Sequence, residues 1–233
     1  MLPIRDDQPR YSTPWVNYFL IGLNLLIFFF EFALDPPSLN ALIRQFGVVP
    51  SHVAALLAGS PSYSVAAVVV PYFTSMFLHG SWLHVIGNMW YLYIFGDNIE
   101  DYLGHFRYLV FYLLAGLVAM ATQVVIYPHS SAPVVGASGA IAGVLGAYFL
   151  LYPRARVLTW FPPIFIFYLS AWITLGLWFV YQFLTGAAAL QIRRAGSDMG
   201  GIAVWAHVGG FIAGMGMIKL FPERSQRHPY AFR

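Results

Sequence analysis

The sequence predicts an all-α polytopic membrane protein whose core is a bundle of six transmembrane helices. Of the 233 residues, 59% are hydrophobic and 9% are charged, whereas charged residues make up roughly 25% of an ordinary soluble domain. A transmembrane helix needs about 20 mostly apolar residues, and six segments reach or approach that length. These segments are residues 15–34, 72–95, 108–127, 138–152, 163–185 and 202–221.

The six segments predict a membrane domain over residues 15–221, between a polar N-terminal segment, 1–14, and a polar C-terminal tail, 222–233. The N-terminal segment has no short apolar core followed by a small-residue cleavage site, so we expect no cleaved signal peptide. The fourth span is short, which predicts a helix that begins below the membrane surface at Ser138. The connection 35–71 is too apolar for a water-exposed loop, and we expect part of it to lie in the membrane interface.

The basic residues are distributed asymmetrically between the loops. If the six spans alternate in direction, nine of the 12 Lys and Arg residues fall on the side that holds both termini. Cytoplasmic loops carry an excess of Lys and Arg, so both termini are expected in the cytoplasm and the protein in the plasma (inner) membrane. The nine are Arg5, Arg10, Arg107, Arg154, Arg156, Lys219, Arg224, Arg227 and Arg233, and the three on the other side are Arg44, Arg193 and Arg194.

Composition also narrows the chemistry. The chain has no cysteine, which excludes a disulfide, a thiolate metal site and a cysteine nucleophile. Because the basic residues gather in a few loops, they indicate membrane topology and not a nucleic-acid surface. We expect no metal ion, no other cofactor and no nucleic-acid partner. The lipid bilayer is the expected partner, and the sequence leaves the oligomeric state open.

A serine opens the fourth predicted helix between glycines. Gly136 and Gly139 leave room for another backbone beside the Ser138 hydroxyl, and a serine exposed in this way is suited to nucleophilic attack. The N–H groups of the first helical turn have no partner within the helix, so they are available to stabilise an oxyanion. The alternative is that the glycines serve helix packing and that Ser138 only caps the helix.

A cluster of polar residues lies in the second predicted helix. His84 and Asn88 are four residues apart and share a helix face, where both side chains can donate hydrogen bonds to one site. Polar residues inside an apolar span are costly and usually mark function, with hydrogen bonding between helices as the alternative.

The sixth predicted helix carries a histidine beside a glycine strip. Gly210 and Gly214 form a G-x-x-x-G pattern, and His207 lies on the same face within one turn of Gly210. Such a strip allows close packing, most simply against the glycine face of the fourth helix, which would bring His207 to Ser138 as a general base. At 1.5 Å per residue, the polar groups of the three helices share a depth of roughly 5–15 Å below the outer surface.

Three motifs of this sequence resemble those of the rhomboid intramembrane serine proteases. They are H-x-x-x-x-H-x-x-x-N in the second helix, G-x-S-G at the start of the fourth and A-H-x-x-G-x-x-x-G in the sixth. The resemblance implies a six-helix rhomboid bundle in which Ser138 is the nucleophile and His207 its general base. It also implies that His84, Asn88 and the backbone N–H of Ser138 bind the oxyanion, and that His79 has a structural role.

The resemblance further implies an endopeptidase that cleaves the transmembrane segments of single-pass protein substrates near the outer membrane face. Residues 153–156 and 171–179 are similar to bacterial members in particular. A helical peptide bond is shielded by its own hydrogen bonds, so we expect small or helix-breaking residues near the cut.

The chain departs from the family pattern in two places. Some relatives carry a tyrosine one turn after the serine, where its ring stacks on the catalytic histidine, and this chain has Ala142. Many relatives have a Trp-Arg pair in the first long loop, and residues 35–71 contain none. The nearest carboxylate in the sequence is that of Asp198, in the loop before the sixth helix. We therefore expect a Ser138–His207 dyad whose activity rises with pH as His207 loses its proton, and little effect of Asp198→Asn.

Two other function classes fit parts of the sequence. A catalytically inactive rhomboid-like protein would bind transmembrane clients without cutting them. A small transporter would use Glu31 and the histidines as a proton relay, and it predicts that Glu31→Gln abolishes function while Ser138→Ala does not. Otherwise Glu31, near the outer end of the first span, is expected to reach the interface. Trp172 and Trp178 are expected to pack within the bundle, with a lateral gate as the alternative.

Overall fold

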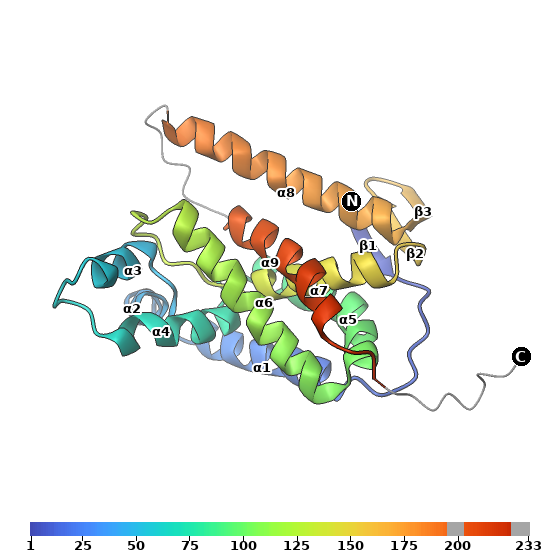
Figure 1. Ribbon diagram of the computed structural model, residues 1–233, viewed down its shortest axis with the longest axis horizontal. Coiled ribbons are helices and arrows are strands. Elements are labelled where there is room, and N and C mark those ends of the chain that lie inside the picture. Colours follow the sequence, from blue (N-terminus) through green and yellow to red (C-terminus); the bar gives the residue numbers. More distant parts are fainter. Residues whose placement is uncertain (195–202, 225–233) are drawn as a thin grey trace, which may run out of the picture.

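The computed structural model describes residues 1–194 and 203–224, which form a helical bundle with a small sheet at one end (Figure 1). Within these residues, three helices are long and apolar enough to cross a membrane, and two shorter helices are also apolar. The long helices are α1 (Trp15–Phe32), α6 (His105–Ile126) and α8 (Ala171–Arg194). The shorter ones are α7 (Ser138–Leu151) and α9 (Val204–Met217). The predicted class, a mostly helical polytopic membrane protein, is confirmed.

The second predicted span falls on a bent pair of helices. The pair consists of α4 (Val65–Thr74), with the short η1 (Ser75–Phe77), and α5 (Trp82–Leu103), which meet at an angle of 77°. The predicted span 72–95 is therefore wrong at its start. The Ser81 hydroxyl accepts a hydrogen bond from the His84 N–H at 3.3 Å, and such an N-cap begins a new helix. Hydropathy does not reveal this break, because both helices are apolar.

Two more helices precede α4 in the connection 35–71. They are α2 (Pro36–Phe46) and α3 (Pro50–Leu57). The Asp35 carboxylate accepts a hydrogen bond from the Ser38 N–H and caps α2, and each helix has a proline in its first turn, where the missing N–H is not needed. The connection is thus largely helical.

The fifth span begins later than predicted, because residues 165–170 form a strand. β2 (Arg156–Phe161) and β3 (Phe165–Ser170) pair in an antiparallel hairpin, and β1 (Leu2–Arg5) pairs with β2 to complete a sheet of order β1-β2-β3. The start of the predicted span 163–185 was wrong because a short apolar run fits a strand as well as a helix. Aromatic and β-branched residues favour the strand.

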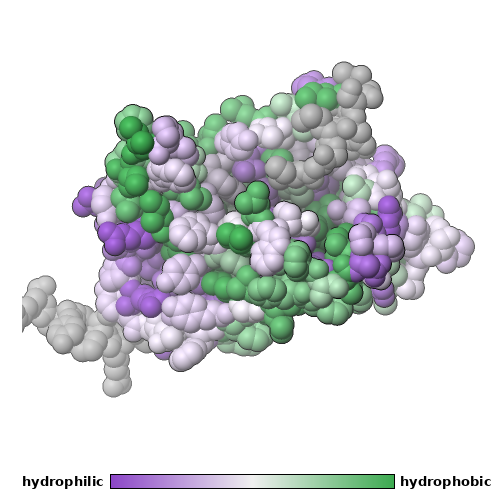
Figure 2. Space-filling view, turned by 180° about the vertical axis from the view of Figure 1, so that it is seen from behind, coloured by the Kyte–Doolittle hydropathy of each residue, from purple (hydrophilic) through white to green (hydrophobic). Residues whose placement is uncertain are grey.

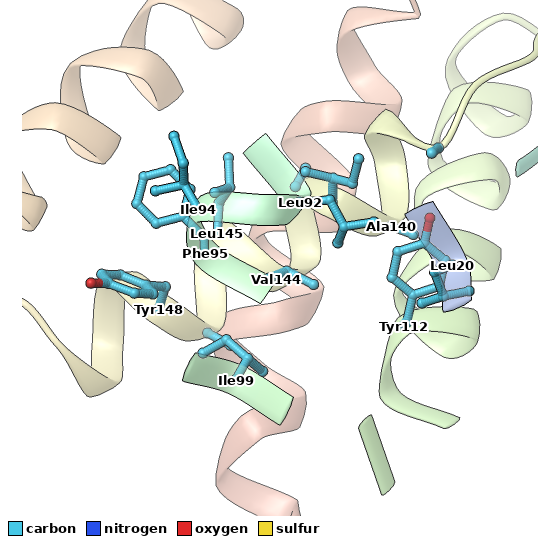
Figure 3. Packing of buried hydrophobic residues seen from close by; sticks show 14 of the residues in the cluster. Leu20, Leu92, Ile94, Phe95, Ile99, Tyr112, Ala140, Val144, Leu145 and Tyr148 are labelled. Carbon is cyan, nitrogen blue, oxygen red and sulfur yellow. The ribbon is translucent and has the colours of Figure 1, made fainter. Parts of the chain in front are cut away.

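Helix α7 lies in the centre of the bundle, between α5, α6 and α9 (Figure 1). Its residues 139–148 are all buried. Figure 3 shows Leu92 and Phe95 of α5 among the side chains that pack near Val144 and Leu145 of α7. A helix that is apolar on every side belongs in a core, so the most buried element of the bundle carries Ser138 at its start.

Glycines let α9 approach α7 at backbone distance. A Cβ added at Gly210 would overlap the carbonyl oxygen of Gly139, and one added at Gly214 would overlap the carbonyl oxygen of Gly143. The structure thus places the two glycine strips against each other, in the arrangement that their spacing predicts.

The outward faces of the bundle are largely apolar. Figure 2 shows hydrophobic side chains over much of the middle of one face and the most hydrophilic side chains nearer its ends. Individual exposed residues include Leu83 of α5 and Leu184 of α8. Such large apolar surfaces are rare on soluble monomers and suit contact with lipid.

Both described ends of the chain lie at the same end of the bundle. β1 joins the sheet that precedes α8 (Figure 1). The Arg224 N–H donates a hydrogen bond to the Tyr102 carbonyl, 2.7 Å away, near the end of α5. The remainder of the predicted tail 222–233, from residue 225 on, and the position Asp198 lie outside the described residues.

Carboxylates of α5 hold the start of α1 and part of the N-terminal segment 1–14 on the bundle. The Glu100 carboxylate accepts hydrogen bonds from the N–H groups of Val16 and Asn17, at 3.0 and 2.6 Å, which pairs donors that the first turn of α1 leaves free. The Asp101 carboxylate accepts hydrogen bonds from the Tyr11 N–H and the Ser12 hydroxyl. The segment is therefore docked on the bundle along part of its length.

Docking of this segment is expected to weaken as the pH rises. Burial, together with the nearby Asp97 and Asp7 carboxylates, raises the pKa of Asp6 from 3.8 to about 7, although the Tyr148 hydroxyl donates a hydrogen bond to it. The docked state binds the Asp6 proton more tightly than the free segment, so its stability falls as the pH rises through this range. Hydrogen exchange in residues 2–12, corrected for intrinsic rates, should be slower at pH 5 than at pH 8. Asp6→Asn should remove most of this difference, and an unchanged difference would assign the effect to another group.

Candidate active site

Ser138 is the first residue of α7, in a tight turn. Gly136 has a φ of +127°, which side chains rarely adopt, and its N–H donates a hydrogen bond to the Ser75 carbonyl at 2.8 Å. Ala137 occupies the N-cap position, and no side chain caps the helix. The alternative that Ser138 only caps its helix is therefore wrong, and its hydroxyl is free for another partner.

Helix α9 supplies that partner, His207. The His207 Nε2 atom lies 2.7 Å from Ser138 Oγ, and the His207 side chain is buried. The glycine packing sets this distance, because Gly210, one turn after His207, contacts the backbone of Gly139, which follows Ser138. A hydroxyl in this position can transfer its proton to the imidazole.

Two side chains of α8 contact His207 from the other side. Gln182 Oε1 lies 3.0 Å from His207 Nδ1, and the Trp178 ring centroid lies 5.9 Å from that of His207 at an angle of 37°. Gln182 and Trp178 thus contact the histidine in this chain, which has Ala142 at the position where some relatives carry a stacking tyrosine. The sequence motifs did not point to Gln182. Its signal is an amide one turn after Trp178 in the mostly apolar first part of α8.

His84 and Asn88 reach the same site from α5 and line one cavity with Ser138. The His84 ring lies so close to Gly136 that a Cβ there would be 2.7 Å from Nε2, which is a second reason for a glycine at that position. The Asn88 Nδ2 atom lies 2.9 Å from His79 Nε2. His79 thus lies behind Asn88, a position compatible with a structural role.

Glu31 is buried, so the expectation that it reaches the interface is wrong. Its residue is 1% exposed, and its carboxylate accepts a hydrogen bond from the His79 backbone N–H, with distances of 3.1 and 3.3 Å. A buried polar group needs a hydrogen-bond partner, and the His79 N–H supplies one to the Glu31 carboxylate inside the bundle. Glu31 thereby helps to place His79 and, through its ring, Asn88.

A cavity of about 710 Å³ adjoins these groups. Ser138, His84, Asn88 and His207 line it, and the rest of its lining is largely apolar, with Leu145 and Trp205 among the residues. Its volume and mostly apolar lining are typical of ligand-binding pockets. Within residues 1–194 and 203–224, no group of three or more His, Asp or Glu side chains is placed to hold a metal ion.

Comparison with known proteins identifies the fold family. The rhomboid domain matches residues 66–224. Similar curated proteins are the mitochondrial presenilin-associated rhomboid-like protein of Mus musculus, 29% identical over 185 residues, the mitochondrial rhomboid protein 1 of Saccharomyces cerevisiae, 29% identical over 148 residues, and the chloroplastic rhomboid-like protein 11 of Arabidopsis thaliana, 37% identical over 71 residues. These alignments cover 76%, 60% and 30% of this chain and 45%, 38% and 25% of the three relatives, respectively.

The chain thus spans less than half of the length of these curated relatives. The relatives are organelle proteins, so the similarity is not specific to bacterial rhomboids. The matched region covers more than half of the chain and includes all three polar motifs. The chain therefore belongs to the rhomboid family.

Proposed function

We propose that this rhomboid is an intramembrane serine endopeptidase that cleaves the transmembrane segments of single-pass membrane proteins. The proposal rests mainly on the 2.7 Å contact between Ser138 Oγ and His207 Nε2, beside a cavity that His84 and Asn88 also line. A nucleophile, a base and two hydrogen-bond donors at one apolar cavity form the set that acyl transfer requires.

The reaction proceeds in two steps. His207 Nε2 takes the Ser138 proton while Oγ attacks the carbonyl carbon of the scissile bond. The resulting oxyanion accepts hydrogen bonds from His84, Asn88 and the Ser138 backbone N–H. The C–N bond then breaks, and His207 passes its proton to the leaving amine. Water attacks the acyl ester with His207 again as the base, which releases the new carboxylate end of the substrate and restores the serine.

The position of the site defines the expected substrates. Ser138 opens a short helix inside the bundle, and the adjoining cavity has mostly apolar walls. A transmembrane helix must lose internal hydrogen bonds before a peptide bond is accessible. Substrates are therefore expected to carry glycine, proline or other weak helix formers near the cut.

We infer that both termini are cytoplasmic and that cleavage occurs near the outer face of the membrane. The end of the bundle that contains β1 and residue 224 also contains seven of the basic residues that the structure describes. Arg44 lies in α2, at the opposite end (Figure 1). This is the asymmetry expected of a cytoplasmic face. The proposal of a plasma (inner) membrane location rests on this asymmetry alone. The seven are Arg5, Arg10, Arg107, Arg154, Arg156, Lys219 and Arg224.

A fluorophosphonate tests the proposal directly. The folded protein in detergent should form a covalent adduct, located at Ser138 by peptide mass spectrometry, because such reagents capture a serine activated by an adjacent base. Heat-denatured protein should not react. The absence of an adduct on folded protein would favour an inactive rhomboid that only binds transmembrane clients.

Loss of either oxyanion donor is expected to slow cleavage without abolishing it. Removing one such donor typically lowers the rate by about 10²–10³-fold, and other donors remain. His84→Ala and Asn88→Ala should therefore lower kcat to this degree with a smaller change in KM, and both should still label slowly. Ile86→Ala, a change at a half-exposed position of the same helix, is the matched control. Wild-type turnover by Asn88→Ala would reduce Asn88 to a structural contact with His79.

A further inference from the structure

The hydrogen bond between Gln182 and His207 joins a third helix to the proposed dyad. Gln182 comes from α8, His207 from α9 and Ser138 from α7, and the contacts run in sequence from Gln182 Oε1 to His207 Nδ1 (3.0 Å) and from His207 Nε2 to Ser138 Oγ (2.7 Å). Both ring nitrogens of the histidine are thereby engaged. These are the two ends at which the protonation state of an imidazole is decided.

The position of the proton in the hydrogen bond between Gln182 and His207 Nδ1 determines whether His207 Nε2 can accept the proton of Ser138. A neutral imidazole carries its proton on one nitrogen and a lone pair on the other. When the Gln182 carbonyl oxygen accepts a hydrogen bond from Nδ1–H, the lone pair is on Nε2 and faces the Ser138 hydroxyl. The opposite tautomer would present Nε2–H to the serine and could not accept its proton.

The ring is also held on its face. Trp178 lies one turn before Gln182 on α8, and its ring is tilted by 37° against the imidazole at a centroid distance of 5.9 Å. Packing of this kind limits tilting of the ring, but it does not distinguish one nitrogen from the other. Of the described side chains that contact His207, Gln182 has an oxygen placed to make that distinction.

We propose that Gln182 is a positioning residue that keeps His207 in the Nδ1–H tautomer and orients its ring toward Ser138. This inference rests on the proposed function of Ser138 and His207. The amide is neutral, so it cannot take the proton from the histidine. Its carbonyl dipole instead stabilises the imidazolium that forms while the serine proton resides on Nε2. Because Gln182 is on α8, the base is oriented only when α8 packs against α9.

Substitutions at Gln182 separate positioning from packing. Gln182→Leu removes the acceptor at similar volume and should lower kcat by about 10–100-fold, the effect of losing one buried hydrogen-bond partner, with KM within about threefold of wild type. Gln182→Glu keeps an acceptor oxygen and should restore most of kcat. Its negative charge should also move the acid limb of the pH–rate profile to higher pH, because it favours the protonated imidazole. Thr185→Val, which alters a hydroxyl bonded within α8, is the control and should behave as wild type.

A direct measurement covers the case in which a variant folds poorly. In wild-type protein with ¹⁵N-labelled histidine, the nitrogen shifts of His207 should show a protonated Nδ1 and an unprotonated Nε2 above the pH of its titration. The reverse tautomer would overturn the proposal.

Two further results would also count against it. Gln182→Leu with unchanged kcat and an unchanged pH profile would show that the bond has no role. Equal losses in Gln182→Leu and Gln182→Glu, with lowered melting temperatures, would show that Gln182 serves packing alone. Failure of the proposed function looks different: Ser138→Ala would then retain the activity of wild type, whatever the Gln182 variants do.

Discussion

Ser138→Ala is expected to abolish proteolysis of a single-pass substrate in reconstituted membranes, with a loss of about 10⁶-fold, the scale seen when a serine nucleophile is removed. The hydroxyl supplies the atom that forms the acyl ester, and no cysteine is present to replace it. Covalent labelling by a fluorophosphonate should disappear as well. Thermal stability should remain nearly unchanged, because the hydroxyl makes one hydrogen bond, to His207, and such a bond contributes about 1 kcal/mol.

Ser130→Ala is the matched control, because Ser130 lines the same cavity and its hydroxyl accepts a local hydrogen bond from the Ala132 N–H. It should cleave at a rate close to wild type. The assay uses a panel of single-pass substrates, with and without glycine or proline in the transmembrane segment. Substantial residual cleavage by purified Ser138→Ala would contradict the assignment of the nucleophile.

Gly214→Ala is expected to destabilise the bundle strongly and to remove activity with it. The added Cβ would overlap the Gly143 carbonyl oxygen and lie 2.7 Å from the Gly143 Cα. These are backbone atoms of α7, so no side-chain rotation relieves the overlap, and α9 must move away. Overpacking typically costs about 1–3 kcal/mol and sometimes more, and we expect the upper part of that range here. The same movement would separate His207 from Ser138.

Gly216→Ala makes the identical chemical change two residues further along α9, where the added Cβ would have no atom within 4 Å other than those of neighbouring residues in its own helix. Melting curves in detergent and cleavage rates should therefore match wild type for Gly216→Ala and fall for Gly214→Ala. Equal stability of the two variants would show that the α7–α9 contact tolerates separation and that the glycine strip is not what holds the site together.

The fold was predictable from the sequence wherever an apolar run corresponds to a single uninterrupted helix. The apolar run that begins at Ser138 and the glycine spacing at Gly210 and Gly214 predict two helices that pack closely, and the structure has them in contact. The predicted boundaries failed at residues 72–81 and 163–170, where an apolar stretch contains an N-cap or a strand. Hydropathy measures preference for lipid and is insensitive to such local changes of direction.

Part of the candidate site was also predictable. Ser138, His84, Asn88 and His207 stand out because polar groups and glycines are conspicuous in apolar helices. Glu31 stood out as well, but its environment was wrongly predicted. Whether a carboxylate near a helix end reaches water or turns inward depends on the donors that other helices offer, and here the His79 N–H is such a donor.

By itself, the sequence determined the membrane class, the residue types of the site and the glycine faces, because each follows from composition or from spacing along a single helix. Only the tertiary structure decided the contacts that no motif spacing indicates, namely those of Gln182 with His207 and of Glu31 with His79. Gln182 and His207 are 25 residues apart, and Glu31 and His79 are 48 apart. Each pair depends on the rotation and depth of two separate helices, which close packing of the whole bundle sets.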